Sequence, residues 1–297
     1  MYLRCYAVAL NFPGDLFAPD RGQPSRIQCR ASESKTTSRR GAVNMNARLW
    51  KTWLGNWISA FVDPRRALGV FNLPRYFSDW SRFVRLGDER LSWKESHPCL
   101  TDWVKHSPFD PHYFYQSYWA ASKIAQRMPR FHVDIGSHVL FAGVTSAFVP
   151  TFFMDYRPLQ AFTGGLVPLA GDLIHLPFAD ASLRSLSCLH VIEHIGLGRY
   201  GDHLDPDGSL KAAKEMVRVL APGGRLILST PVGRERIQFN AHRIFSPEKV
   251  RGMLNPLVMV DFAYVDDARN FHAHVSPDLA SKCTYACGMF EFERSIA

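Results

Sequence analysis

The sequence predicts an α/β domain built around a parallel sheet, because short apolar runs alternate with a helical pattern. The runs Val167–Ala170, Ser185–His190 and Arg225–Thr230 have the length of buried strands. Between the last two, apolar residues recur at helical spacing over Leu210–Leu220, and a Pro-Gly-Gly turn at residues 222–224 follows. A helix of this length between two strands indicates a βαβ unit, in which the strands are parallel.

The segments on either side extend this domain over residues 110–297. Further strands are predicted at Phe131–Ile135, Val149–Asp155, Leu257–Val265 and Thr284–Glu293. A helix is expected from Asp110 to about Met128, since Asp caps a helix well and the following Pro111 suits its first position. Ser246, followed by Pro and Glu, predicts the start of another helix.

The composition is that of a protein with a packed core and free thiols. The 297 residues include 7 Trp and 21 Phe, and the length suffices for one large domain or two small ones. The net charge is +8, but residues 1–66 carry eleven Lys and Arg against four Asp and Glu, so the remainder is nearly neutral. No nucleic-acid partner is therefore indicated for the main domain. The 6 scattered cysteines favour reduced thiols in a cytoplasmic protein, and Cys283-x-x-x-Cys287 lacks the second ligand pair of a zinc site.

Two N-terminal segments precede the domain. Residues 1–44 are rich in Ser, Arg, Gly and Pro, which fits disorder, a transit peptide, or a misannotated leader before a true start at Met45. The last is favoured, because helical periodicity begins directly after Met45. Residues 45–109 form an aromatic helical extension, with a stripe from Trp50 to Phe61 and a second helix over Tyr76–Phe83. The stripe fits either peripheral contact with the inner membrane face or, by preference, packing on the domain or on a second subunit.

Three motifs in order resemble those of the class I S-adenosylmethionine-dependent methyltransferases. They are Gly171-Asp172 with Leu176-Pro177-Phe178, His190-Val191-Ile192-Glu193-His194, and Arg218-Val219-Leu220-Ala221-Pro222-Gly223-Gly224. With Asn240-Ala241-His242-Arg243, the chain looks most like a little-characterised bacterial branch of that superfamily. The resemblance implies a Rossmann-like sheet of seven mostly parallel strands whose last strand is antiparallel, with helices on both faces. It also implies S-adenosyl-L-methionine as the cofactor.

The first strand ends in a turn that resembles the first motif of this family, and the resemblance assigns Asp134, Gly136 and Ser137 to cofactor binding. A glycine at such a turn lets the backbone approach a ligand closely. The chain departs from the family where further glycines are usual, because His138 and Leu140 stand there.

Two acids follow at later strand ends. Asp155 lies 19 residues after Gly136, which is close to the spacing of about 20 expected for a carboxylate that binds a ribose. An Asx turn is the alternative for Asp155. The resemblance assigns Asp172 and Leu173 to the adenine, and a helix cap is the alternative for Asp172.

The His190–His194 segment has two interpretations. A zinc-protease pair needs both histidines on one helix, but Gly196 and Gly198 would cut that helix short. We therefore expect no metal site, and we place His190 at a strand end facing the cofactor, with Glu193 at the mouth of an acceptor pocket. His194 is the first choice for a general base and His190 the second, and the alternative is that neither acts as a base.

The glycine-rich loop Ile195–Gly208 is long enough to be a lid. By analogy with the fold, Asn240, His242 and Arg243 point toward the acceptor, where Arg243 would bind an acidic group or instead pair with the loop. The expected function is methyl transfer to a small-molecule or saccharide acceptor at oxygen. A non-catalytic scaffold of the same fold is the alternative, and the oligomeric state is not predicted.

Overall fold

The computed structural model describes residues 68–87 and 89–296. The chain divides after Phe109 into two compact units, which we describe separately. The leader predicted for residues 1–44 and the aromatic stripe from Trp50 to Phe61 lie outside the described residues. Peripheral membrane contact through that stripe therefore stays a prediction.

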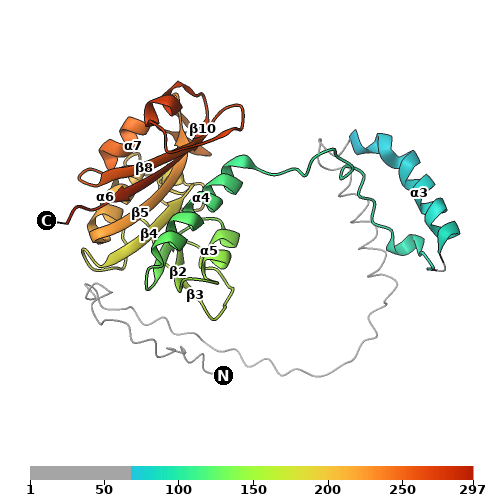
Figure 1. Cartoon of the computed structure of the whole chain (residues 1–297), viewed down its shortest axis with the longest axis horizontal. Helices are drawn as coiled ribbons and strands as arrows, with labels where there is room; N and C mark the ends of the chain where they lie inside the picture. The colour runs from blue at the N-terminus through green and yellow to red at the C-terminus, as the bar shows by residue number, and fades with distance from the viewer. Residues whose placement is uncertain (1–67, 88, 297) are drawn as a thin grey trace. The chain divides into compact units, whose positions relative to one another are not determined.

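The larger unit is built on one mixed sheet with the strand order β3-β2-β1-β4-β5-β10-β8-β9 (Figure 1). The strands are β1 (His132–Ile135), β2 (Thr151–Asp155), β3 (Leu166–Ala170), β4 (Leu183–Leu189), β5 (Leu220–Val232), β8 (Val258–Val265), β9 (Phe271–Ala273) and β10 (Ala286–Glu293). Strands β1 to β5 are parallel to one another, whereas β10 runs antiparallel between β5 and β8. The predicted fold class is confirmed: the sheet is Rossmann-like and mostly parallel, and its last strand is antiparallel.

Four short elements were not predicted. Strand β9 adds an eighth strand at the edge beyond β8, and β6 (Arg236–Gln238) pairs with β7 (His242–Ile244) in a separate hairpin. Helix α5 (Val139–Thr145) follows β1. Segments of three to seven residues are too short to show a period, so tertiary contacts decide their conformation.

The longer helices form where the sequence places them. Helix α4 (Pro111–Arg127) begins at Asp110, whose Oδ1 accepts from the backbone N–H of His112 at 2.9 Å and of Tyr113 at 3.2 Å. Helix α6 (Gly208–Val219) is the helix between β4 and β5, and α7 (Pro247–Met253) is capped by the Ser246 hydroxyl.

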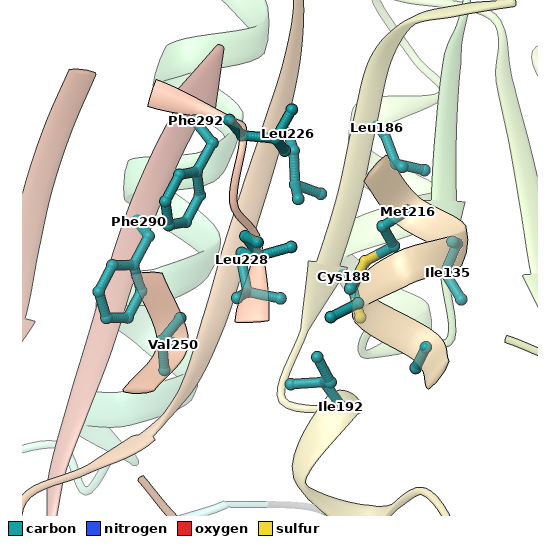
Figure 2. Packing of buried hydrophobic residues seen from close by; sticks show 14 of the residues in the cluster. Ile135, Leu186, Cys188, Ile192, Met216, Leu226, Leu228, Val250, Phe290 and Phe292 are labelled. Atoms are coloured by element: carbon teal, nitrogen blue, oxygen red, sulfur yellow. The ribbon is translucent and has the colours of Figure 1, made fainter. Parts of the chain in front are cut away.

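Alternate side chains of the sheet bury against helices on both faces. Leu226 and Leu228 of β5 lie in one cluster with Met216 of α6 and Val250 of α7 (Figure 2). The side chain between them, Ile227, belongs to the opposite cluster with α4 and α5. Each such fully buried side chain contributes about 1.5–3 kcal/mol, so the sheet edge that carries the site rests on a two-sided core.

The smaller unit contributes the 3₁₀ turn η1 (Leu68–Asn72), helix α3 (Leu73–Leu86) and the turn η2 (Trp93–Glu95). The predicted helix over Tyr76–Phe83 lies within α3. Rings of α3 contact η2, with Trp80 and Trp93 centred 5.3 Å apart. Across the described part of the chain, every helix is too short or too polar to cross a bilayer.

Candidate functional site

Two cavities adjoin each other at the carboxyl ends of the parallel strands. The carboxylate cavity is lined by Gly136, Asp155, Asp172 and Leu173, together with residues of the 195–208 loop. The histidine cavity is lined by the following residues, among others: His112, Tyr113, Ser137, His138, His190, Glu193, His194, His242 and Tyr285. The two share Gly136, His190, His194 and Tyr200. Open parallel sheets bind ligands at this edge, near the point where the strand order reverses, which here lies between β1 and β4.

Asp155 and Asp172 each use one oxygen to hold a turn and leave the other available. Oδ1 of Asp155 accepts from the Arg157 backbone N–H at 2.7 Å, and Oδ1 of Asp172 accepts from that of Ile174 at 3.1 Å. Among the described residues, neither Oδ2 has a hydrogen-bond partner. The turn alternative is therefore present at Asp155, whereas Asp172 holds a turn and not the helix start that was its alternative, and neither contact excludes a ligand.

Gly136 lies in the left-handed region, with φ of +59°. A Cβ built there would lie 3.3 Å from both methyl groups of Val191 and 3.7 Å from Oδ2 of Asp155. Glycine thus avoids strain in the turn and keeps the side of Asp155 open. Its N–H already donates to the Met154 carbonyl at 2.8 Å, so this turn supplies room for a ligand rather than a donor.

Asp134 lines neither cavity and holds the turn after β1, which is one of the two roles expected for it; cofactor contact through water stays a prediction. Its side chain is fully buried, and Oδ1 accepts from the Ser137 hydroxyl at 2.6 Å and from the Ser187 hydroxyl. Ser137 in turn accepts from the Leu189 backbone N–H at 3.1 Å. Asp134 therefore holds the turn after β1 against β4 from the buried side. Both faces of β1 are buried, so the sequence offered no pattern that shows where this carboxylate points.

A buried chain of hydrogen bonds continues from Asp134 to His132. Burial lowers the pKa of His132 to about 3, so its ring is neutral. The Ser187 hydroxyl donates to Asp134, so it accepts from the Nε2–H of His132 at 2.8 Å. Nδ1 of His132 then accepts from the Ser185 hydroxyl, also at 2.8 Å. Burial raises the pKa of Asp134 to about 7, against the lowering effect of its serine donors.

This raised pKa makes the stability of the protein depend on pH. Because the pKa of Asp134 rises from 3.8 to about 7 on folding, its stabilising contribution is complete below pH 3.8 and is lost as the pH rises through 7. Each pH unit between the two pKa values changes this contribution by about 1.4 kcal/mol. The free energy of unfolding of Asp134→Asn, relative to wild type, should therefore rise by about 2–3 kcal/mol between pH 5 and pH 8. Urea unfolding of both proteins at the two pH values measures this. A difference that does not change with pH would contradict the prediction, and Asp207→Asn at an exposed site is the control.

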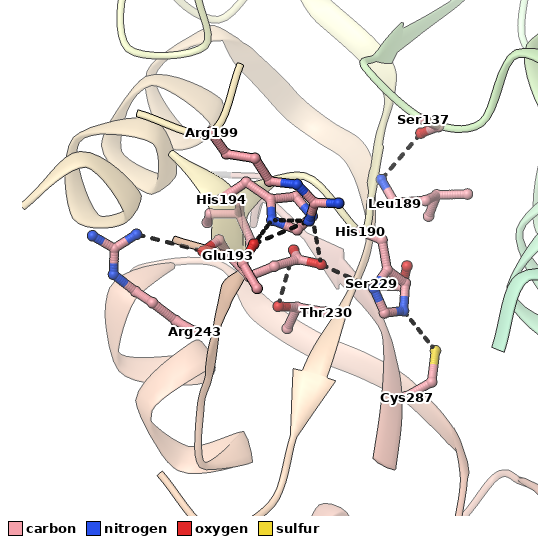
Figure 3. A network of polar contacts seen from close by, with 12 residues as sticks. Ser137, Leu189, His190, Glu193, His194, Arg199, Ser229, Thr230, Arg243 and Cys287 are labelled. Atoms are coloured by element: carbon pink, nitrogen blue, oxygen red, sulfur yellow. Dashed lines mark hydrogen bonds and ion pairs between the residues drawn. The ribbon is translucent and has the colours of Figure 1, made fainter. Parts of the chain in front are cut away.

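His190 and Glu193 form a buried ion pair at the centre of the network in Figure 3. Nδ1 of His190 lies 2.9 Å from Oε1 of Glu193, and Nε2 lies 3.3 Å from Sγ of Cys287. Burial opposes charge on this ring, but the Cys287 sulfur and the Glu193 carboxylate outweigh it and raise the pKa of His190 well above its usual value. Burial also opposes charge on Glu193, yet His190 keeps the pKa of Glu193 below normal.

His194 has one nitrogen committed to the backbone and one available for chemistry. Its Nδ1 lies 2.6 Å from the Ala241 carbonyl oxygen, an acceptor only, so Nδ1 carries the proton. Nε2 therefore holds the lone pair and lies 3.7 Å from Oε1 of Glu193, beyond hydrogen-bond distance. Burial lowers the pKa of His194 despite this carboxylate. His190, by contrast, has both nitrogens engaged. His194 therefore has a ring nitrogen outside hydrogen-bond distance of a partner and His190 has none, while the role of either as a base stays a prediction.

The three residues predicted to bind the acceptor are placed differently from one another. His242 lines the histidine cavity and packs on Tyr285, with ring centroids 5.4 Å apart. Asn240 is exposed and lines neither cavity. Arg243 lines neither cavity, unlike the expected position facing the acceptor. Its guanidinium is buried and donates to the carbonyl of Ile195 at 2.6 Å and to the hydroxyl of Ser209 at 3.1 Å. Arg243 thus holds the 195–208 loop, as in the alternative to ligand binding, but mostly through backbone carbonyls instead of an ion pair.

Several residues of the histidine cavity were missed from the sequence. His112 and Tyr113 come from the first turn of α4, and Tyr285 precedes β10. The His112 ring is centred 5.5 Å from that of Tyr285 and 6.1 Å from that of His190. His112, His190 and Tyr285 are each more than 70 residues apart in the chain, so no local motif connects them.

Comparisons with known proteins concern parts of the chain or the fold. A family model described as Caenorhabditis protein of unknown function, DUF268, matches residues 181–286, about a third of the chain. No curated protein matches the sequence.

Solved structures with a similar fold include methyltransferases. The N-methyltransferase NodS of Bradyrhizobium japonicum WM9, in complex with S-adenosyl-L-homocysteine, is 15% identical over 61% of this chain and 87% of its own, with a TM-score of 0.42. The 1,6-didemethyltoxoflavin-N1-methyltransferase of Burkholderia thailandensis is 12% identical over 65% and 94%, also with a TM-score of 0.42. The cyclase SpnF is 14% identical over 71% and 86%, with a TM-score of 0.45. These similarities do not assign a reaction to this chain.

Proposed function

We propose that the chain binds S-adenosyl-L-methionine in the carboxylate cavity and transfers its methyl group to a small-molecule or saccharide acceptor in the histidine cavity. The observation that carries the proposal is the pair Asp155 and Asp172. Asp155 ends β2 and Asp172 lies two residues after the adjacent strand β3. Both border one cavity, and each has an oxygen without a partner among the described residues. A nucleoside presents hydroxyl and amine donors that such oxygens accept.

Four residues of the carboxylate cavity have distinct roles in this proposal. Oδ2 of Asp155 accepts from the ribose hydroxyls, while Asp172 accepts from the adenine amine and the Leu173 backbone N–H donates to a ring nitrogen. Gly136 provides room where the two cavities meet. The departure at His138 is accommodated, since this side chain caps α5 by accepting from the Leu140 N–H at 3.3 Å.

The histidine cavity supplies the acceptor side. Methyl transfer is a direct displacement, so holding the acceptor in line with the methyl group provides most of the catalysis. We infer that the acceptor atom is a hydroxyl oxygen, because the available Nε2 of the neutral His194 can take the proton released as the methyl group moves. His194 borders both cavities and therefore lies beside the path between cofactor and acceptor.

Titration calorimetry with S-adenosyl-L-homocysteine tests the proposal. We expect saturable binding of one equivalent per chain. NAD should not bind, because the turn after β1 lacks the G-x-G-x-x-G glycines that a dinucleotide requires. No heat of binding at millimolar S-adenosyl-L-homocysteine would overturn the proposal and would leave a non-catalytic scaffold as the better interpretation.

A further inference from the structure

Below the histidine cavity, three potential metal ligands converge from separate elements. His112 comes from the start of α4, His190 follows β4, and Cys287 lies in β10. Each offers one ligand atom, and these atoms lie within 4.8 Å of one another. The closest pair, Nε2 of His190 and Sγ of Cys287, is separated by 3.3 Å (Figure 3).

The His190 ring contacts Glu193 through one nitrogen and Cys287 through the other. Glu193 accepts from Nδ1–H at 2.9 Å, so Nε2 is the nitrogen presented to Cys287. A carboxylate on the far nitrogen of a histidine is the usual support of a metal-bound imidazole, because it sets the tautomer and the ring orientation. His190 also has φ of +55°, a left-handed conformation that is uncommon for a residue other than glycine and is concentrated at functional sites.

We propose that His112, His190 and Cys287 bind one zinc ion at the floor of the histidine cavity. Zinc bonds of about 2.0–2.1 Å to nitrogen and 2.3 Å to sulfur place tetrahedral ligands about 3.5 Å apart. The His190–Cys287 pair already has nearly this separation. His112 is half-buried at a helix start, and a movement of about 1 Å brings it within bonding distance.

The ligand set selects zinc over harder cations. One thiolate and two imidazoles suit zinc, whereas magnesium and calcium prefer oxygen ligands. Binding would displace the thiol proton of Cys287 and any proton on Nε2 of His190. His194 is not a ligand here, since Nδ1 donates to Ala241 and the residue belongs to the 3₁₀ turn η3 (Ile192–His194), which follows His190. The site therefore differs from a helical zinc-protease pair, in which both histidines of the motif would bind the metal.

Three protein ligands leave one tetrahedral position open. His112 and His190 both line the histidine cavity, so water or a bound molecule would occupy that position. If the proposed methyl transfer holds, an acceptor oxygen there would be polarised by the ion, an extension that rests on the proposed function. Zinc binding itself does not depend on it.

Cobalt titration of the chelator-stripped full chain tests the site. Co²⁺ should give a thiolate-to-metal charge-transfer band that saturates at one equivalent, and Zn²⁺ should abolish the band by competition. Cys287→Ser should lose the band, and His112→Ala should weaken Zn²⁺ affinity more than about a hundredfold, beyond the effect usual for a supporting residue. Cys283→Ser and the exposed His175→Ala are controls that keep both properties.

Two results would each overturn the zinc site. The first is a wild-type protein without the charge-transfer band, and the second is a Cys287→Ser variant that keeps it. Should Cys287→Ser fail to fold, unchanged Zn²⁺ affinity in His112→Ala overturns the proposal instead. Asp155→Ala should retain zinc while losing S-adenosyl-L-homocysteine, so failure of the cofactor proposal and failure of the metal proposal give different results.

Discussion

Replacement of Asp155 by alanine is expected to weaken S-adenosyl-L-homocysteine binding by at least about a hundredfold. The carboxylate oxygen that faces the cavity would accept from both ribose hydroxyls. Hydrogen bonds to a charged group contribute about 1.5–3 kcal/mol each, and the loss of two amounts to about 3 kcal/mol or more. Calorimetry on the folded variant measures the change.

Two further variants make the Asp155 experiment specific. Asp155→Asn keeps the size of the side chain and one acceptor oxygen, so its affinity should lie between that of wild type and that of the alanine variant. Asp207→Ala removes an exposed carboxylate near the same loop and should bind as wild type does. An unchanged affinity in Asp155→Ala would refute the ribose assignment while leaving the fold untouched.

Glu193→Ala is expected to destabilise the metal-free protein by about 3–5 kcal/mol. Glu193 is fully buried, and its carboxylate balances the His190 ring 2.9 Å away. Removal of one partner leaves an uncompensated charge in the interior, and this accounts for the large cost. Urea unfolding of chelator-stripped protein gives the free energy of unfolding of each variant.

Glu193→Gln is the matched control for this second experiment. Its amide oxygen still accepts from Nδ1–H of His190, so the cost should be clearly smaller than that of alanine. Thr230→Val, which removes only the 3.3 Å hydrogen bond to Oε2, should cost less again. Equal stability of Glu193→Ala and Glu193→Gln would mean that no buried charge depends on this carboxylate.

The sheet could be predicted because each long element carries its own period. The apolar runs that became β4 and β5 and the helical pattern of α6 lie close to where the structure has them, but β5 already begins at Leu220 and includes the predicted turn at residues 222–224. Helix α4 was predictable from Asp110 and Pro111 alone, since both act locally on the first turn. The three-residue strands β6, β7 and β9 have no such signal, because they exist only through pairing with a neighbour.

The carboxylate cavity was partly predictable for a related reason. Asp155 ends a parallel strand and Asp172 lies two residues after another, and the carboxyl ends of parallel strands meet at one edge of the sheet. Asp134 differs from them, because it lies one residue before its strand ends and points inward to Ser137 and Ser187. A strand reverses side-chain direction at every residue, so a shift of one position moves a carboxylate from the cavity into the core.

The sequence by itself determined the layered sheet and the edge at which Asp155 and Asp172 lie, because periodicity and strand ends are local properties. Only the tertiary structure decided which side chains meet there. Arg243 turned toward the loop carbonyls rather than a ligand, and His112 and Cys287 met at His190 from elements more than 70 residues apart. Packing, hydrogen bonding and burial select such contacts across the whole fold, and spacing along the chain does not record them.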